Sequence, residues 1–144
     1  MGQILVAGGG ASGLMAAVAA ARQGAKVTLL EKNKQTGRKL LVTGNGHCNF
    51  TNRNQEQGKY RSGSPAFVER ALKAFGWEDA VAFFEELGIP ARDRDGYLYP
   101  ASGQAASVAD ALRLEASRLK VKMSCNTEIL SVEYRDGRFL ARTG

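Results

Sequence analysis

The feature that most constrains the fold is a glycine-rich turn, GGGASG, at residues 8–13. It fits the pattern G-x-G-x-x-G. The apolar run Gln3 to Ala7 before it is typical of a buried parallel strand. The alanine-rich segment Ala11 to Gln23 after it predicts a helix that ends at Gly24. A second apolar run, Lys26 to Leu30, predicts another buried strand, so the chain opens with a βαβ unit of the dinucleotide-binding type.

Each glycine of the pattern has a mechanical reason. Gly8 allows the tight turn, Gly10 lets the backbone approach a pyrophosphate, and Gly13 lets the helix press on the sheet. The first helical residues, Ala11 and Ser12, offer free N–H groups and the positive end of the helix dipole. We therefore expect these five residues to bind the phosphates of a dinucleotide.

An acidic residue ends the second predicted strand. Glu31 lies eighteen residues after Gly13, where a carboxylate accepts hydrogen bonds from an adenosine ribose. A carboxylate there disfavours a 2′-phosphate, so FAD or NAD fits this position better than NADP. We place the adjacent Lys32 among the cofactor-binding residues as well. The alternative is an ordinary strand-end acid after an ordinary βα turn.

A second unusual segment follows directly, GRKLLVTGNGHCNFTN at residues 37–52. A domain that binds only NAD would normally continue with its next helix and strand here. Instead Arg38 and Lys39 supply positive charge, while Gly44 and Gly46 permit close backbone approach. A dense polar loop of this kind suits the second half of a larger cofactor, with a pyrophosphate and a hydrogen-bonding ring system.

The remaining elements are predicted from helical and alternating patterns. In chain order they are a helix from Ser64-Pro65 to Phe75, a helix after Gly76 with the apolar stripe Trp77, Ala80, Val81, Phe84 and Leu87, an extended piece from Arg92 to Pro100, a helix from Ser102 to about Leu119 with Ala105, Val108, Ala109, Leu112, Ala116 and Leu119 facing inward, a strand from Val121 to Cys125, and a hairpin around Asp136-Gly137. The fold class is therefore α/β, with a three-stranded parallel sheet, flanking helices and a crossover β-hairpin.

Composition excludes several function classes. The longest uncharged apolar run, Leu14 to Ala21, is too short to span a bilayer, and residues 1–5 lack signal-peptide character. Cys48 and Cys125 form neither a disulfide framework nor a metal-ligand pattern. The net charge of +6 could indicate nucleic acid, but the basic residues are scattered. We expect a soluble, cytoplasmic protein with a small-molecule substrate, no metal, and no nucleic-acid or membrane partner.

The two motifs together, GGGASG with Glu31 and then GRKLLVTGNGHCNFTN, resemble the BaiN-like (YhiN-type) NAD(P)/FAD-dependent oxidoreductases. The segment GYLYPAS at residues 96–102 resembles that family's G-R-V-[FY]-P-x-S block. The resemblance implies a FAD/NAD(P)-binding Rossmann-like domain of glutathione-reductase type. It also implies FAD as cofactor, NAD(P)H as a candidate transient reductant, and hydride transfer to or from a small organic substrate.

The resemblance assigns residues to the cofactor. It places Ser12, Glu31, Arg38, Lys39, Thr43 and Asn49 against FAD, and it places the backbone of Ile129 at the adenine. Gly44, Asn45 and Gly46 of the 37–52 segment are counted among the cofactor-binding residues as well.

The chain departs from the family pattern in two places. His47 stands where the family usually has Arg, and Tyr97-Leu98 replaces Arg-Val. His47 is the only histidine, so it is either a proton donor or a tolerated loop substitution. Cys48 is either a redox thiol or, as we favour without a C-x-x-C partner, a small residue near the flavin.

The resemblance implies a protein of about three domain lengths. Residues 1–144 are thus expected to be the N-terminal portion of an incomplete FAD-binding domain. Its parts are a βαβ unit (3–31), a flavin loop (37–52), a helical segment (64–119) and a strand with crossover hairpin (121–142). Alone, this chain is expected to be inactive. The alternatives are a non-catalytic dinucleotide-binding fragment and a naturally short protein.

Overall fold

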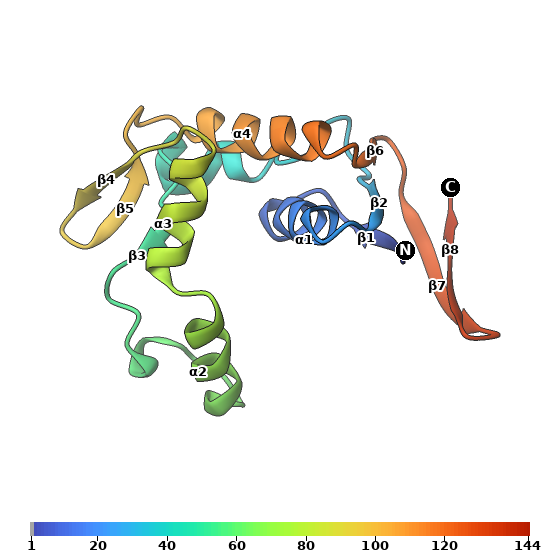
Figure 1. Ribbon diagram of the computed structural model, residues 1–144, viewed down its shortest axis with the longest axis horizontal. Coiled ribbons are helices and arrows are strands. Elements are labelled where there is room, and N and C mark those ends of the chain that lie inside the picture. The colour runs from blue at the N-terminus through green and yellow to red at the C-terminus, as the bar shows by residue number, and fades with distance from the viewer. Residues whose placement is uncertain (1) are drawn as a thin grey trace. The chain divides into compact units, whose positions relative to one another are not determined.

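A computed structural model describes residues 2–144, without the side chain of Gln57. The chain forms two compact units (Figure 1). The first contains the chain up to Leu40 together with Leu112–Gly144, and the second contains Leu41–Ala111. The boundary at residue 40 falls inside the predicted flavin loop, so the residues predicted to bind the cofactor are divided between the units.

The first unit is built on a three-stranded parallel sheet, as predicted, and its strand order is β1-β2-β6. The strands are β1 (Gln3–Ala7), β2 (Lys26–Leu30) and β6 (Lys122–Ser124), and β2 lies between the other two (Figure 1). Helix α1 (Ala11–Arg22) connects β1 to β2 and contacts both strands. This is the predicted βαβ unit, and it places the glycine-rich turn at the carboxyl end of β1.

Helix α1 and β2 supply much of the buried apolar surface of this unit. Leu14, Ala17 and Val18 of α1 are fully buried, and so is Leu29 of β2. The helix ends where predicted, because Gly24 takes a φ of +82° that other residues rarely adopt.

The expectation that β1 is buried is wrong. Ile4 and Leu5 are 41% and 46% exposed, whereas Val27 of β2 is 3% exposed. In the described part of the chain β1 is an edge strand, while β2 has a neighbour on each side. An apolar run predicts strand formation but does not say whether a second strand covers its edge.

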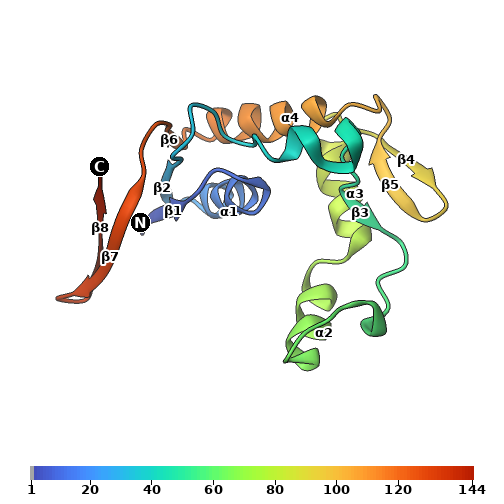
Figure 2. The same cartoon turned by 180° about the vertical axis from the view of Figure 1, so that it is seen from behind.

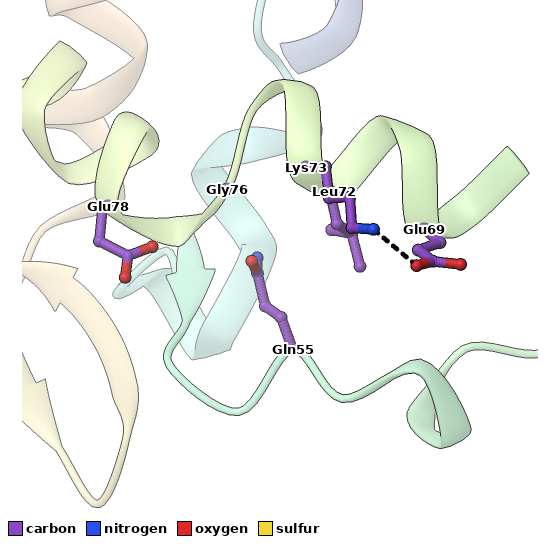
Figure 3. Close-up of a pocket in the computed structure, with 6 residues that line it drawn as sticks. All are labelled: Gln55, Glu69, Leu72, Lys73, Gly76 and Glu78. Carbon is purple, nitrogen blue, oxygen red and sulfur yellow. Dashed lines mark hydrogen bonds and ion pairs between the residues drawn. The ribbon is translucent and has the colours of Figure 1, made fainter. Parts of the chain in front are cut away.

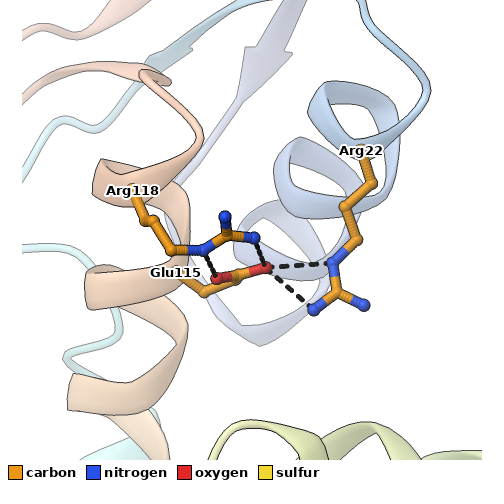
Figure 4. Close-up of polar contacts among 3 residues, drawn as sticks. All are labelled: Arg22, Glu115 and Arg118. Carbon is orange, nitrogen blue, oxygen red and sulfur yellow. Dashed lines mark hydrogen bonds and ion pairs between the residues drawn. The ribbon is translucent and has the colours of Figure 1, made fainter.

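A charged cluster ties the C-terminal half of α4 (Ala105–Arg118) to α1 (Figure 4). The Glu115 carboxylate, only 5% exposed, accepts hydrogen bonds from Arg22 at 2.8 and 3.0 Å and from Arg118 at 2.7 and 2.9 Å. Both carboxylate oxygens are therefore bound by guanidinium groups. The apolar stripe predicts the helix, but nothing in it indicates that position 115 carries a buried charge.

We expect this cluster to make the free energy of unfolding depend on pH. Hydrogen bonds from Arg118, which outweigh the opposing effect of burial, and from Arg22 lower the pKa of Glu115 from 4.5 to about 2. Because the folded-state pKa lies below the unfolded one, the stabilisation is complete above pH 4.5. It is lost as the pH falls towards 2.

The loss should be about 2–3 kcal/mol. Urea unfolding at pH 6, 4 and 2.5 measures the free energy of unfolding of the native protein and of Glu115→Gln. The difference between the two should become smaller as the pH falls over this range. The exposed Glu133→Gln is the matched control. A difference of constant size across the series would contradict the assignment.

The start of α4 differs from the prediction. The helix begins at Ala105 rather than capping on Ser102. Ser102 Oγ instead accepts a hydrogen bond from the Gln104 N–H at 3.2 Å, within the turn before the helix. The predicted inward-facing residues are buried, except for the half-buried Leu119: Ala105, Val108, Ala109, Leu112 and Ala116.

The predicted hairpin is confirmed. Strands β7 (Ile129–Arg135) and β8 (Arg138–Thr143) pair in antiparallel fashion around Asp136 and Gly137. These two turn residues have φ values of +51° and +76°, as a tight Asp-Gly hairpin turn requires.

The second unit contains helices α2 (Pro65–Ala74) and α3 (Trp77–Glu86) and a small antiparallel sheet, shown from behind in Figure 2. The sheet order is β3-β5-β4, with β3 at Thr51–Asn52, β4 at Ala91–Arg94 and β5 at Tyr97–Pro100. Short 3-10 turns span Leu40–Gly46 and Gln57–Lys59. Both helices lie where predicted. The single extended piece expected from residue 92 to 100 is wrong, because the segment folds back as a hairpin.

Among residues 2–144, no helix combines the length and apolar character that crossing a membrane requires. In the same part of the chain, no group of three or more His, Cys, Asp or Glu side chains is arranged to hold a metal ion.

Candidate nucleotide-binding site

The glycine-rich turn has the geometry that its sequence predicts at Gly8 and Gly13. Gly8 has a φ of +91°, and its N–H donates to the Leu30 carbonyl at 2.8 Å. A Cβ on Gly13 would lie 1.9 Å from the Gly8 carbonyl oxygen and 3.5 Å from Val6 Cγ1. Helix α1 therefore approaches the turn and β1 more closely than any side chain at position 13 allows.

Gly10 differs from these two glycines. Its φ of −73° and ψ of −171° are open to any residue, and a Cβ there would meet no protein atom within 4 Å. The fold itself gives no reason for glycine at this position. The open space beside the start of α1 is where the sequence predicts a pyrophosphate.

Glu31 is held by the glycine turn as well as by its own loop. Its Oε2 accepts the Gly9 N–H at 2.7 Å, and its Oε1 accepts the Asn33 N–H and Nδ2 at 2.8 and 2.6 Å. The carboxylate is 7% exposed. Burial by itself raises the pKa of Glu31, but these hydrogen bonds and the nearby Lys32 charge outweigh it and lower the pKa. The side chain is therefore ionised at neutral pH.

This arrangement leaves limited capacity for a ligand. A carboxylate offers about four acceptor positions, and three donors from Gly9 and Asn33 already occupy positions on Glu31. The side chain both positions the turn and retains about one acceptor position for a ribose hydroxyl. The sequence predicts the second role and misses the first.

A pocket of about 380 Å³ lies beside Glu31 in the first unit. It brings together four residues predicted to bind the cofactor, Gly8, Glu31, Lys32 and Ile129. Its other lining residues, which the sequence analysis did not identify, are Ala7, Leu30, Asn33, Thr127 and Glu128. These residues could have been identified only by their place in the chain, because they adjoin the carboxyl ends of β1 and β2 or precede β7.

The two predicted cations at the start of the flavin loop, Arg38 and Lys39, are exposed. Arg38 Nη1 donates to Asn33 Oδ1 at 3.3 Å, so this guanidinium lies beside the residue that also holds Glu31.

The rest of the predicted flavin loop belongs to the second unit. Gly44 and Asn45 have φ values of +53° and +57°, and Gly46 has +86°. A Cβ on Gly44 would lie 3.0 Å from the Asn49 backbone nitrogen, so the close approach at Gly44 is to the loop itself. Asn49 Nδ2 donates to the carbonyls of Thr51 and Leu98 at 2.9 and 3.0 Å, which joins the loop to β5.

The two reactive side chains of the loop have structural partners. His47 Nδ1 lies 2.6 Å from the Gly103 carbonyl oxygen, an acceptor, so Nδ1 is the donor in this contact. Cys48 is 2% exposed. Burial raises the pKa of Cys48 despite a hydrogen bond with Thr43. A buried protonated thiol supports the small-residue interpretation of Cys48 over the redox one.

The second unit also contains a shallow pocket of about 320 Å³ between the loop before α2 and the junction of α2 with α3 (Figure 3). Its charged groups include Glu69 and Lys73, which pair with each other at 2.8 Å. The sequence gives no sign of this pocket.

The parallel βαβ unit, the glycine turn and the acid at the end of β2 define a Rossmann-like domain of the dinucleotide-binding class. More specifically, the chain belongs to the HI0933-like protein Rossmann domain family, which it matches over residues 2–143. This confirms the resemblance drawn from the two glycine-containing motifs.

Two curated relatives are similar over most of this chain. A 3-dehydro-bile acid delta(4,6)-reductase from Clostridium scindens is 41% identical over 99% of the chain and 35% of its own length. A ribosomal RNA dihydrouridine synthase from Haemophilus influenzae is 33% identical over 90% of the chain and 32% of its own length. The chain thus spans about a third of the length of these relatives.

Solved structures share the fold at lower identity. A 3-ketosteroid-delta4-(5alpha)-dehydrogenase from Rhodococcus jostii RHA1 has a TM-score of 0.67 at 13% identity, covering 97% of this chain and 44% of that one. A flavocytochrome c3 fumarate reductase has a TM-score of 0.61 at 22% identity, covering 94% of this chain and 28% of that one. Both matches support the Rossmann-like architecture.

Proposed function

We propose that this chain supplies the adenosine and pyrophosphate end of the cofactor site in a FAD-dependent oxidoreductase. The observation that carries the proposal is the pocket at the carboxyl ends of β1 and β2, with an ionised Glu31 hydrogen-bonded to the glycine turn. The proposed cofactor-binding residues are Gly8, Gly10, Ala11, Ser12, Gly13, Glu31, Lys32, Arg38, Lys39, Thr43, Gly44, Asn45, Gly46, Asn49 and Ile129.

The start of α1 fits a phosphate. Gly10 caps the helix without a side chain, and the first turn contains no acidic residue. The N–H groups of the first helical residues are therefore not satisfied by a capping side chain, and the helix dipole adds positive potential. A pyrophosphate is a suitable acceptor for these groups.

The position of Glu31 favours a cofactor without a 2′-phosphate. An ionised carboxylate at the ribose repels a phosphate on the 2′-oxygen, which disfavours NADP in this pocket. FAD is preferred over NAD because the Gly/Asn-rich loop at residues 37–52 follows directly, as in the family the motifs resemble. NAD(P)H is proposed as the transient reductant.

The names of the two relatives suggest a reaction type. A delta(4,6)-reductase of a 3-dehydro bile acid and a dihydrouridine synthase each saturate a ring C=C bond that lies near a carbonyl group. Such a reduction adds a hydride and a proton, and FAD, once reduced, supplies the hydride when bound. Glu31 and the α1 N-terminus would orient the cofactor. His47 is the candidate proton donor. Because its Nδ1–H is held by Gly103, the proton would come from Nε2 of the imidazolium form.

We favour a small organic substrate with such a bond. The second candidate is a base in RNA, because a relative at 33% identity is named for ribosomal RNA. One observation on this chain supports it: the first unit contains 13 of the 20 Lys and Arg residues but 5 of the 14 Asp and Glu residues. A basic unit of this kind attracts phosphate backbones.

The test is to purify the protein, release its bound cofactor by denaturation, and identify it by chromatography. We expect FAD rather than FMN or NAD. In a version as long as the relatives, NAD(P)H oxidation under nitrogen should then depend on a ring enone, whereas the 144-residue chain alone should turn nothing over. Turnover only with uridine-containing RNA would favour the second candidate. Absence of any bound or bindable flavin would overturn the proposal.

We expect Glu31→Ala to weaken FAD binding by tenfold or more. The variant loses a charge-assisted hydrogen bond to the ribose, worth about 1.5–3 kcal/mol, and also releases the Gly9 N–H. Glu128→Ala is the matched control, because Glu128 lines the same pocket and its substitution removes the same charge. Flavin titration of both variants measures the difference. Equal losses would mean that only pocket charge matters.

A further inference from the structure

We propose that Arg113 on α4 is a positioning residue for the pyrophosphate-binding turn. It holds Thr36 and Gly37 against Gly9, and this contact aims the Gly10 N–H at the cofactor phosphate. The inference rests on the proposed function, because it concerns the same phosphate site.

The first step is the contact between α4 and the segment after β2. Arg113 Nε donates to the Thr36 carbonyl at 3.2 Å, and Arg113 Nη2 donates to the same oxygen. Thr36 is 4% exposed, and its hydroxyl oxygen lies 3.4 Å from Arg113 Nε. Two nitrogens of one planar guanidinium therefore hold a single buried carbonyl, a geometry that a lysine ammonium cannot reproduce.

The second step is the contact between this segment and the glycine turn. The Gly37 N–H donates to the Gly9 carbonyl at 2.6 Å. A Cβ on Gly9 would lie 2.6 Å from Thr36 Cγ2, so the Thr36 side chain packs directly on the Gly9 backbone. On the other side the Gly9 N–H is bound by Glu31. Both polar groups of Gly9 are thus fixed by residues that follow β2.

The third step is the peptide plane. In a trans peptide the carbonyl of one residue and the N–H of the next point in opposite directions. With the Gly9 carbonyl held by Gly37, the Gly10 N–H is directed away from residues 36 and 37. A rotation of this plane would turn a carbonyl, rather than an N–H, towards the phosphate.

Helix α4 is itself anchored to the phosphate-binding helix. Glu115, two residues after Arg113, binds Arg22 of α1 through its buried carboxylate (Figure 4). Arg113 therefore holds the loop from a support that is fixed relative to α1. This is why we assign to it a positioning role rather than a general attraction for anions.

The experiment compares ADP with adenosine by calorimetric titration of the protein freed of its flavin. Both ligands use the Glu31 pocket, but only ADP uses the turn. We expect Arg113→Met to weaken ADP binding at least tenfold and to change adenosine binding less than twofold. Arg113→Lys should fall between the native protein and Arg113→Met.

The control for charge is Lys122→Met, which removes an exposed cation of β6 from the same unit and leaves the Glu115 cluster intact. It should change ADP binding less than twofold. Thr36→Ser, which removes the methyl group that packs on Gly9, gives a milder variant if Arg113→Met does not fold. It should weaken ADP binding while leaving adenosine binding unchanged.

Equal loss of ADP and adenosine binding, or equal effects of Arg113→Met and Lys122→Met, would overturn the positioning role and leave the proposed function intact. Failure of the native protein to bind ADP, adenosine or FAD would instead overturn the proposed function, and this inference with it.

Discussion

Replacing Gly10 by valine is expected to abolish FAD and ADP binding while leaving the fold intact. The backbone at Gly10 is extended and compatible with valine, and a Cβ there meets no protein atom within 4 Å. The substitution therefore introduces almost no strain into the folded protein. The added methyl groups would fill the space beside the first N–H groups of α1, where the pyrophosphate is proposed to lie. We expect affinity for ADP to fall by more than a hundredfold.

The measurement pairs binding with stability. Thermal unfolding of Gly10→Val followed by circular dichroism should give a midpoint within a few degrees of the native one. Flavin content after dialysis should be close to zero. A variant that purifies with normal flavin stoichiometry would show that the turn does not contact the cofactor, and it would remove the central support for the proposed function.

The glycine turn shows what sequence can and cannot predict about this site. The left-handed backbone at Gly8 and the close helix contact at Gly13 follow from general rules for the βαβ unit. The role of Gly9, an x position in the motif, does not. Its N–H is bound by Glu31, 22 residues away, and its carbonyl by Gly37. Only the path of the chain after β2 brings these groups together.

Two Asp-Gly pairs show how flanking residues decide an interpretation. Asp95-Gly96 and Asp136-Gly137 both form tight hairpin turns with positive φ. The hairpin at Asp136-Gly137 is predicted by the sequence, because alternating apolar residues flank this pair. The hairpin at Asp95-Gly96 is not, because the preceding strand, Ala91–Arg94, is mostly charged and has no such alternation. The Asp-Gly pair indicates a turn in both cases, but only one pair has flanking residues that indicate strands.

The flavin loop was identified largely through resemblance, and its internal geometry could not be predicted. The sequence suggests that Asn49 faces a ligand, yet its side-chain nitrogen bonds the Thr51 and Leu98 carbonyls. The same uncertainty applies to Gly44, whose lack of a side chain accommodates the loop's own backbone. A polar residue in a Gly/Asn-rich loop can bind a cofactor or satisfy the loop, and composition does not separate the two.

Moving the same substitution three residues along the chain should produce the opposite result. In Gly13→Val the new Cβ would lie 1.9 Å from the Gly8 carbonyl oxygen, and this atom belongs to backbone that cannot rotate away. Gly8 is itself held by the Leu30 carbonyl, so α1 would have to move off the sheet. That movement would expose Leu14 and Val18, which are fully buried.

The loss in free energy of unfolding for Gly13→Val should therefore be at least about 3–5 kcal/mol, as for other severe core disruptions, which is a large share of the stability of a typical domain. The expected outcome is an insoluble or unfolded protein, detected by loss of the cooperative thermal transition. Gly10→Val, with its fold retained, serves as the matched control. A Gly13→Val variant that folds and loses only its flavin would contradict this prediction. It would mean that position 13 contacts the cofactor rather than the sheet.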